Sequence, residues 1–137
     1  ERGGLGITVL SDTDFSSILE IQRIFLSAAV VLGVNGAGLA NIVFCRVGAH
    51  VVEIACPQRA CHYFGHLAAA LDLRYWWVRG PRLLWGMQLV PTPEVEILGV
   101  LEEIATQRGH EAAAEGSVDK MCQTGFSDRD SESCVAS

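Results

Sequence analysis

The longest uncharged stretch of the chain runs from Ile24 to Cys45, with an arginine on either side. It is long enough to cross a membrane as a helix, because about 20 apolar residues suffice. Three glycines and two asparagines fall in its second half, however, and lipid offers the amide side chains no hydrogen-bonding partner. We therefore expect three short elements instead: a buried strand over 28–34, a glycine turn over 35–38 and a helix that begins at Leu39.

The rest of the chain alternates between strand-like and helix-like patterns. The run from Ile7 to Leu10 is rich in β-branched residues, which predicts a strand, and the apolar spacing after it predicts a helix to about residue 27. The same patterns recur and predict strands over 49–55 and 74–78, a helix over 60–73, a short strand over 87–90 and a last helix from Pro93 to Gly109.

Strands that alternate with helices form a parallel sheet with right-handed crossovers. Residues 7–105 are therefore predicted to form one α/β unit with helices on both faces of the sheet. Strand 28–34 is apolar without alternation, which is typical of a strand covered on both faces, so we place it at the centre of the sheet. The side chains expected to be buried are Val30, Val31, Leu32, Val51, Val52, Leu67 and Leu71.

Composition narrows the function classes. The 137 residues suit one domain, and 16 acidic against 10 basic residues give a net charge of −6. Because no basic stripe accompanies them, no nucleic-acid partner is expected. Large apolar residues become rare from His110 onward, which predicts a folded domain over 1–109 and a disordered tail over 110–137. The chain opens without a methionine or a leader sequence, and we expect it to be part of a longer protein.

The glycine turn over 35–38 carries the most specific candidate chemistry. Backbone N–H groups and a helix N-terminus can meet an anion there, and Gly36 and Gly38 let a ligand approach the backbone. Glu53 ends the next strand, where an acid in a nucleotide-binding β-α-β unit accepts hydrogen bonds from ribose. Asn41 stands where the dinucleotide fingerprint has its third glycine or alanine, so the pattern alone is weak. A turn that only reverses the chain is the competing interpretation.

Histidines and cysteines offer a weaker candidate. His62 and His66 lie four apart on a predicted helix, downstream of Cys56 and Cys61, but no glutamate follows His62 to act as a base. Histidines at a helix surface or in the core are the simpler interpretation, and no metal is expected. The two cysteines close a small disulfide or stay as thiols, and both alternatives remain open.

Three tryptophans are candidates for stacking on a sugar or a base. Trp76 and Trp77 are adjacent on one predicted strand and must point to opposite faces of the sheet, so one of them is expected in the core. Trp85 follows a few residues later.

A longer pattern resembles a known family. The stretch SAAVVLGVNGAGLANIVFCRVGAHVVEIACP, followed by YFGHLAAALDLRYWWV, is similar to the C-terminal region of glycosyltransferase family 61. In that family a strand runs into His-Gly-Ala-Gly-Leu-Thr-Asn, and a Gly-Ala pair, a strand with a glutamate and a helix–strand junction follow. The likeness covers about residues 15–105. The residues that recur in order are Gly33, Gly36-Ala37-Gly38-Leu39, Asn41, Phe44, Gly48-Ala49, Glu53, Leu67 to Ala70 and Tyr75.

The resemblance implies a Rossmann-like domain, the C-terminal one of the two in a GT-B glycosyltransferase. Such a domain binds a nucleotide sugar, often UDP-linked, and the N-terminal domain of the full-length protein carries most of the acceptor site. Members transfer xylose, arabinose or N-acetylglucosamine to glycans or proteins in the secretory pathway, in the ER or Golgi lumen. The nucleotide sugar is a substrate, and no further cofactor is implied. By position, the binding residues are Asn35, Gly36, Ala37, Gly38 and Leu39 at the diphosphate and Glu53 at the ribose or base.

The sequence departs from the family at one functional position. Asn35 stands where the family has histidine, which removes a group that could carry a proton near the diphosphate. Catalysis by this chain alone is therefore not implied. Two other function classes compete with the transferase. One is a non-catalytic Rossmann-like interaction module, which Asn35 favours, and the other is an NAD(P)-binding oxidoreductase fragment, which Asn41 and the short helix disfavour.

Overall fold

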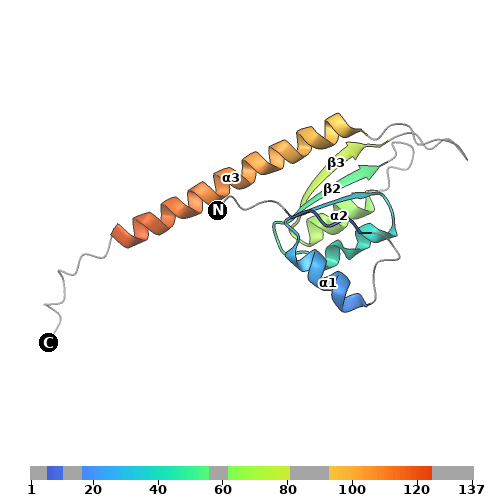
Figure 1. Ribbon diagram of the computed structural model, residues 1–137, viewed down its shortest axis with the longest axis horizontal. Coiled ribbons are helices and arrows are strands. Elements are labelled where there is room, and N and C mark those ends of the chain that lie inside the picture. The colour runs from blue at the N-terminus through green and yellow to red at the C-terminus, as the bar shows by residue number, and fades with distance from the viewer. Residues whose placement is uncertain (1–5, 11–16, 56–61, 81–92, 125–137) are drawn as a thin grey trace, which may run out of the picture. The chain divides into compact units, whose positions relative to one another are not determined.

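The computed structural model describes residues 6–10, 17–55, 62–80 and 93–124, with side chains as far as residue 113 (Figure 1). The chain divides into two compact units, Glu1–Val100 and Leu101–Ser137, and the description below concerns the first except where α3 is named. The elements in order are α1 (Ile18–Ser27), β1 (Val30–Val34), the 3₁₀ helix η1 (Ala37–Phe44), β2 (His50–Ala55), α2 (Tyr63–Ala70), β3 (Arg74–Arg79) and α3 (Glu94–Thr124).

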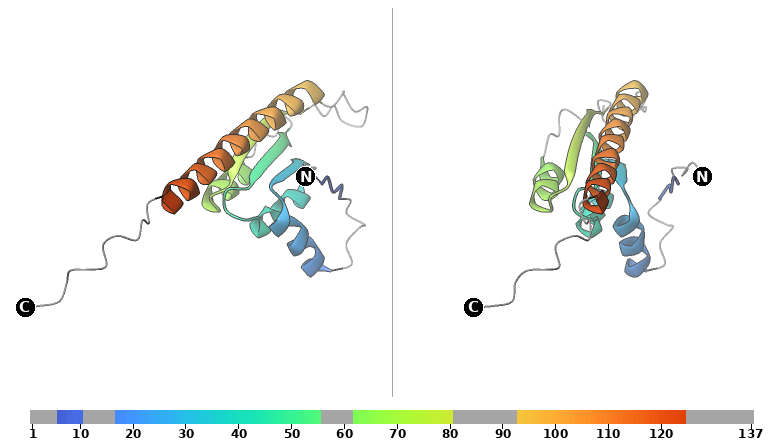
Figure 2. Two further views of the ribbon diagram at one scale, coloured as in Figure 1. Left: turned by 60° about the vertical axis from the view of Figure 1, so that its left-hand side comes forward. Right: turned by 90° about the vertical axis from the view of Figure 1, so that its left-hand side faces the viewer.

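The three strands form an open parallel sheet in the order β1-β2-β3, as Figure 2 shows. The predicted α/β class and parallel sheet are therefore confirmed. The predicted central position of strand 28–34 is wrong, because β2 is the middle strand and β1 lies at an edge of the described sheet. The crossover from β1 to β2 and the one from β2 to β3 both advance across the sheet in the same direction. The second strand in the sequence is therefore the central one.

One face of the sheet, which we call the helix-covered face, carries the main core. In register across the strands this face holds the rows Val31–Val51–Tyr75 and Gly33–Glu53–Trp77. Right-handed crossovers that advance in one direction place their helices on one face. The core accordingly joins α1, η1 and α2 to that face through Phe25, Leu39, Ile42, Ala49, Val51, Ala68 and Leu73. The prediction of helices on both faces stays a prediction for the opposite face.

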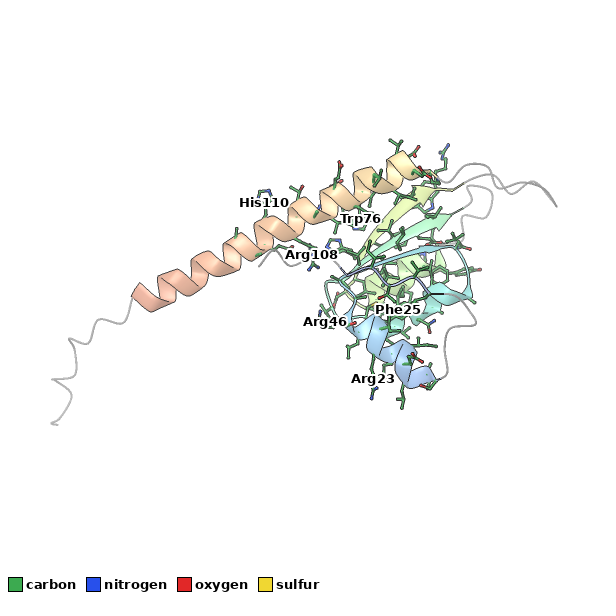
Figure 3. All side chains as sticks on the ribbon, in the orientation of Figure 1. Arg23, Phe25, Arg46, Trp76, Arg108 and His110 are labelled. Carbon is green, nitrogen blue, oxygen red and sulfur yellow. The ribbon has the colours of Figure 1, made fainter. Side chains whose placement is uncertain are left out.

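Helix α1 shows why the long apolar run divides. Ser17 caps the helix, its hydroxyl oxygen accepting a hydrogen bond from the backbone N–H of Glu20 at 3.3 Å. Phe25 enters the core, whereas Arg23 on the same helix points away from the sheet (Figure 3). Ala28 then adopts an extended backbone and ends the helix. The predicted division of the run into a strand, a glycine turn and a helical segment is confirmed in order, with the boundary correction given below for Leu39. No described helix is long and apolar enough to cross a membrane.

Burial separates the middle strand from the edge strand. All six residues of β2 are buried, and Val51 and Val52 have 0% exposure, as predicted. In β1, Leu32 is 45% exposed and Val34 is 70% exposed, so the expected burial of Leu32 is wrong. The four remaining residues predicted to be buried are half-buried: Val30, Val31, Leu67 and Leu71. An apolar strand sequence does not distinguish an edge strand from a central one, because both require one well-packed face.

Three predicted boundaries also need correction. Residues 7–10 form no strand, and Ile7 and Val9 are 88% and 86% exposed, because strand propensity alone does not hold a strand that has no partner. Leu39 lies in a 3₁₀ helix that begins earlier, at Ala37. Helix α3 continues past Gly109 to Thr124, since one glycine costs a helix only about 1 kcal/mol and helix-forming residues follow it.

The predicted domain boundary and the predicted strand over 87–90 are not tested by the described helices and strands. The division into a domain over 1–109 and a tail over 110–137 stays a prediction, although the helix enters the second range. The strand expected over 87–90 lies outside the described residues.

A charge at Val51 is expected to abolish cooperative folding, because an unpaired buried carboxylate costs several kcal/mol. Val34→Asp is the matched control at a 70% exposed position, and it should cost less than about 1 kcal/mol. Urea unfolding followed by circular dichroism measures both. Equal stability of Val51→Asp and the wild-type chain would show that β2 is not the core strand.

Candidate functional site

The predicted site residues gather at the carboxyl end of the sheet. Asn35 follows directly after β1, and its backbone N–H donates to the carbonyl oxygen of Ile54 at 2.9 Å. This hydrogen bond extends the pairing of β1 with β2 by one step. Glu53 lies opposite Gly33 in the register and therefore points to the same face as the side chain of Asn35. The structure thus brings Asn35 and Glu53 together, although 18 positions separate them in the sequence.

A buried carboxylate links these two strands to the third. Glu53 is 1% exposed, and its Oε1 accepts a hydrogen bond from Asn35 Nδ2 at 2.5 Å. Its Oε2 accepts one from the hydroxyl of Tyr75 in β3 at 2.6 Å. Both oxygens therefore have a donor, which a buried carboxylate requires. An ionised carboxylate only accepts, so the amide of Asn35 must turn its nitrogen toward Glu53 and its oxygen elsewhere.

Tyr75 is a member of the site that the chemical patterns in the sequence did not single out. Its ring crosses Gly65 of α2, where an added Cβ would lie 3.2 Å from a ring carbon. Burial, followed by the hydrogen bond and negative charge of Glu53, raises the pKa of the Tyr75 hydroxyl. The available signal was the resemblance, in which Tyr75 is one of the residues that recur in order, although no chemical role was assigned to it.

Leu39 and Asn41, which follow the glycine turn, have structural roles within the chain. The side chain of Leu39 is 4% exposed and packs directly over Gly33, where a Cβ would lie 2.9 Å from a Leu39 methyl carbon. The N–H of Leu39 donates to the carbonyl oxygen of Gly36 at 3.1 Å. Asn41 Nδ2 donates to the carbonyl oxygen of Gly38 at 3.1 Å and fixes the first turn of η1. Leu39 therefore lies in the core beneath the turn, with its N–H already bonded.

The remaining three residues of the turn, Gly36, Ala37 and Gly38, face outward. All three are exposed, and within the described backbone their N–H groups donate no hydrogen bond. A Cβ on Gly38 would meet nothing within 4 Å, and one on Gly36 would meet only the carbonyl oxygen of Val34 at 3.8 Å. Gly36 is also extended, a conformation open to any residue. Nothing in the part of the chain that the structure describes thus requires glycine at either position.

Glu53, which was expected to contact ribose, makes its hydrogen bonds within the chain instead. Its side chain is buried and both oxygens are bonded within the chain, so its direct effect is to hold Asn35 and Tyr75. The side chain of Asn35 is half-buried and retains its carbonyl oxygen and one N–H for other partners. Asn35 is therefore the member of this group that is placed to meet a ligand.

The other sequence candidates are the histidines with the cysteines upstream of them and the tryptophans, of which Trp85 lies outside the described residues. His62 and His66 are exposed, the two cysteines upstream of them lie outside the described residues, and no described group of three His, Cys, Asp or Glu could hold a metal. Trp76 points to the opposite face, where its Nε1 donates to Nδ1 of the buried His50 at 3.0 Å (Figure 3). Trp77 lies on the helix-covered face and is 41% exposed.

Comparison of the chain with protein-family models, with curated proteins and with solved structures finds no match. The likeness to glycosyltransferase family 61 therefore depends on the sequence residues quoted for it. The functional argument has to come from the geometry of the turn.

Gly33→Ala is expected to destabilise the chain by about 1–3 kcal/mol, because the added methyl group collides with a buried leucine that has little room to move. Gly38→Ala is the matched control, with open space around the new methyl group, and should leave stability unchanged or raise it by up to about 1 kcal/mol. Chemical denaturation measures both variants. Equal effects of the two substitutions would contradict the packing of Leu39 over Gly33.

The raised pKa of Tyr75 predicts a loss of stability at high pH. The unfolded chain releases the tyrosine proton near the ordinary pKa of 10.0, whereas the folded chain keeps it to higher pH, so the free energy of unfolding falls as pH rises above 10.0. The chain has two tyrosines, so Tyr63→Phe leaves Tyr75 as the only one. In that variant, ultraviolet absorbance of tyrosinate should appear together with loss of circular dichroism. A folded protein that titrates near 10.0 would contradict the hydrogen bond to Glu53.

Proposed function

We propose that this chain is the nucleotide-sugar-binding part of a glycosyltransferase of the family 61 type, with a Rossmann-like fold, and that the turn from Gly36 to Gly38 holds the diphosphate of a UDP-sugar. The observation that carries the proposal is a row of three exposed residues whose backbone N–H groups have no acceptor in the described backbone, two of them glycines with room for a side chain. A phosphate oxygen needs both features, donors that face outward and room to approach them.

The position of the turn supports an anionic ligand. It lies at the carboxyl end of a parallel strand and at the N-terminus of η1, where aligned peptide dipoles leave a partial positive charge. Ligands of open α/β sheets bind at this end of the strands. Three N–H groups together with the helix end favour a diphosphate over a neutral ligand.

The negative charge of Glu53 favours a phosphate over the glycine turn and hydroxyl groups at Asn35. A phosphate placed directly over Asn35 would lie close to a carboxylate of like charge. The same phosphate over Gly36 to Gly38 meets N–H groups that have no acceptor in the described backbone. Asn35 then offers its carbonyl oxygen and remaining N–H to hydroxyl groups of the sugar or ribose, and Glu53 fixes the orientation of that amide.

The reaction that this arrangement supports is transfer of a sugar. The bond from the anomeric carbon to the diphosphate oxygen breaks, the nucleotide leaves as its diphosphate, and the acceptor hydroxyl gives up its proton as the new glycosidic bond forms. The turn contributes by positioning the donor and stabilising charge on the leaving group. The acceptor, a glycan or glycoprotein, and the base belong in this proposal to the N-terminal domain of the full-length protein in the secretory pathway. The class of sugar is that of xylose, arabinose or N-acetylglucosamine.

A non-catalytic Rossmann-like interaction module is the second candidate. It is favoured by Asn35, whose amide cannot exchange a proton as the histidine of the family could. An NAD(P)-binding oxidoreductase is less favoured than either, since Asn41 stands where the dinucleotide fingerprint has its third glycine or alanine.

Ligand protection against thermal unfolding separates these functions. UDP at about a hundredfold excess over its Kd should stabilise the chain by about 2.7 kcal/mol, because it binds only the folded state. Gly36→Val should abolish this protection, since its side chain occupies the approach to the N–H groups without a clash in the fold. Gly6→Val is the control, at a position with equally open surroundings outside any helix or strand.

The outcomes distinguish the three functions. Protection by UDP and UDP-sugars that is lost only in Gly36→Val supports the transferase. Protection by NAD alone supports the oxidoreductase and contradicts the proposal. Absence of protection by any of these ligands contradicts the proposal and leaves the non-catalytic module.

A further inference from the structure

Trp77 lies on the same face and toward the same end of the sheet as the turn. It is in register with Glu53, and through Glu53 with Gly33, so these three residues form one row across the strands. It is 41% exposed, in contrast to Trp76, whose indole N–H is bonded to His50 on the opposite face. A tryptophan ring exposed to this extent at the ligand-binding end of a parallel sheet offers a flat apolar surface to a ligand.

Beyond Trp77, the end of β3 carries a positive charge on the same face of the sheet. The next row holds Ala55, which is 3% exposed, and its partner Arg79, which is exposed at the end of β3. Two strand spacings separate the turn from β3, which is about 10 Å. Glu53 and Ala55 are both buried, so these two residues of β2 offer no exposed side chain between β1 and β3.

The end of β3 is held firmly against β2. The N–H of Gly80 donates to the carbonyl oxygen of Ala55 at 2.8 Å. A Cβ on Gly80 would lie 3.0 Å from a methyl carbon of Ile54 and 3.2 Å from the Ala55 oxygen. This close contact with β2 fixes the position of the carboxyl end of β3, and with it the positions of Trp77 and Arg79.

We propose that Trp77 stacks on the base of the nucleotide whose diphosphate lies on Gly36 to Gly38, with Arg79 as the adjacent positive charge. This inference rests on the proposed function and adds a second contact to it. A nucleoside diphosphate joins an aromatic ring to an anion across a ribose. This end of the sheet presents an exposed tryptophan and a turn whose N–H groups have no acceptor in the described backbone. Neither a free phosphate nor a sugar without a base would use both.

Binding of UDP and of inorganic pyrophosphate to the full chain, measured by isothermal titration calorimetry, tests this inference. Trp77→Leu should weaken binding of UDP about tenfold, because stacking of a base on an aromatic ring contributes on that scale, and should leave pyrophosphate unchanged. Trp77→Phe should retain most of the affinity for UDP, since it keeps a ring. Gly36→Val should lose both ligands. Circular dichroism of each variant confirms that it is folded, which the exposure of Trp77 leads us to expect.

Failure of the inference and failure of the proposed function give different results. Wild-type affinity for UDP in a folded Trp77→Leu chain, with binding still lost in Gly36→Val, overturns the stacking role and leaves the diphosphate site. Equal weakening of UDP and pyrophosphate by Trp77→Leu also overturns it, because the effect then is not on the base. A wild-type chain that binds neither ligand overturns the proposed function, and the stacking role with it.

Discussion

Glu53 is a carboxylate with 1% exposure in the middle strand of a small sheet, and burying such a group costs several kcal/mol unless donors satisfy it. One donor comes from Asn35 at the end of β1 and the other from Tyr75 in β3, so a single side chain ties all three strands. A shift of either neighbour by one residue would turn its donor to the opposite face and leave the charge unpaired. The requirement to satisfy Glu53 therefore specifies the strand register and, through Asn35, the start of the glycine turn.

The residues of the turn divide into those that the fold explains and those that it does not. Gly33 makes room for Leu39, and Asn41 bonds the carbonyl of Gly38. Among the described residues there is room for a Cβ at Gly36 and at Gly38, yet both positions are glycine. A ligand that approaches the backbone gives these two glycines a physical reason, and this is the basis on which a phosphate-binding function is argued.

Much of the fold between residues 17 and 80 could be predicted from the sequence, because the helices and strands described there carry apolar patterns of their own and α1 has a serine N-cap. The position of a strand in the sheet could not, since Leu32 in the edge strand and Val52 in the middle strand are equally apolar in sequence but 45% and 0% exposed. The strand predicted at Ile7 failed because pairing, and not propensity, decides a short strand. In the site, local pattern indicated Asn35 and the glycines. Tyr75 could not be indicated in that way, because its contact with Glu53 depends on a register that only the assembled sheet sets.

The central claim is that the exposed N–H groups of Gly36, Ala37 and Gly38 bind the diphosphate of a nucleotide. Amide proton and nitrogen chemical shifts in an NMR titration of the chain with UDP test it most directly, since they report on those groups one by one. The account predicts that the largest shifts occur at these three amides and saturate together as UDP is added. Shifts that are absent there, or that centre on another part of the chain, would contradict it.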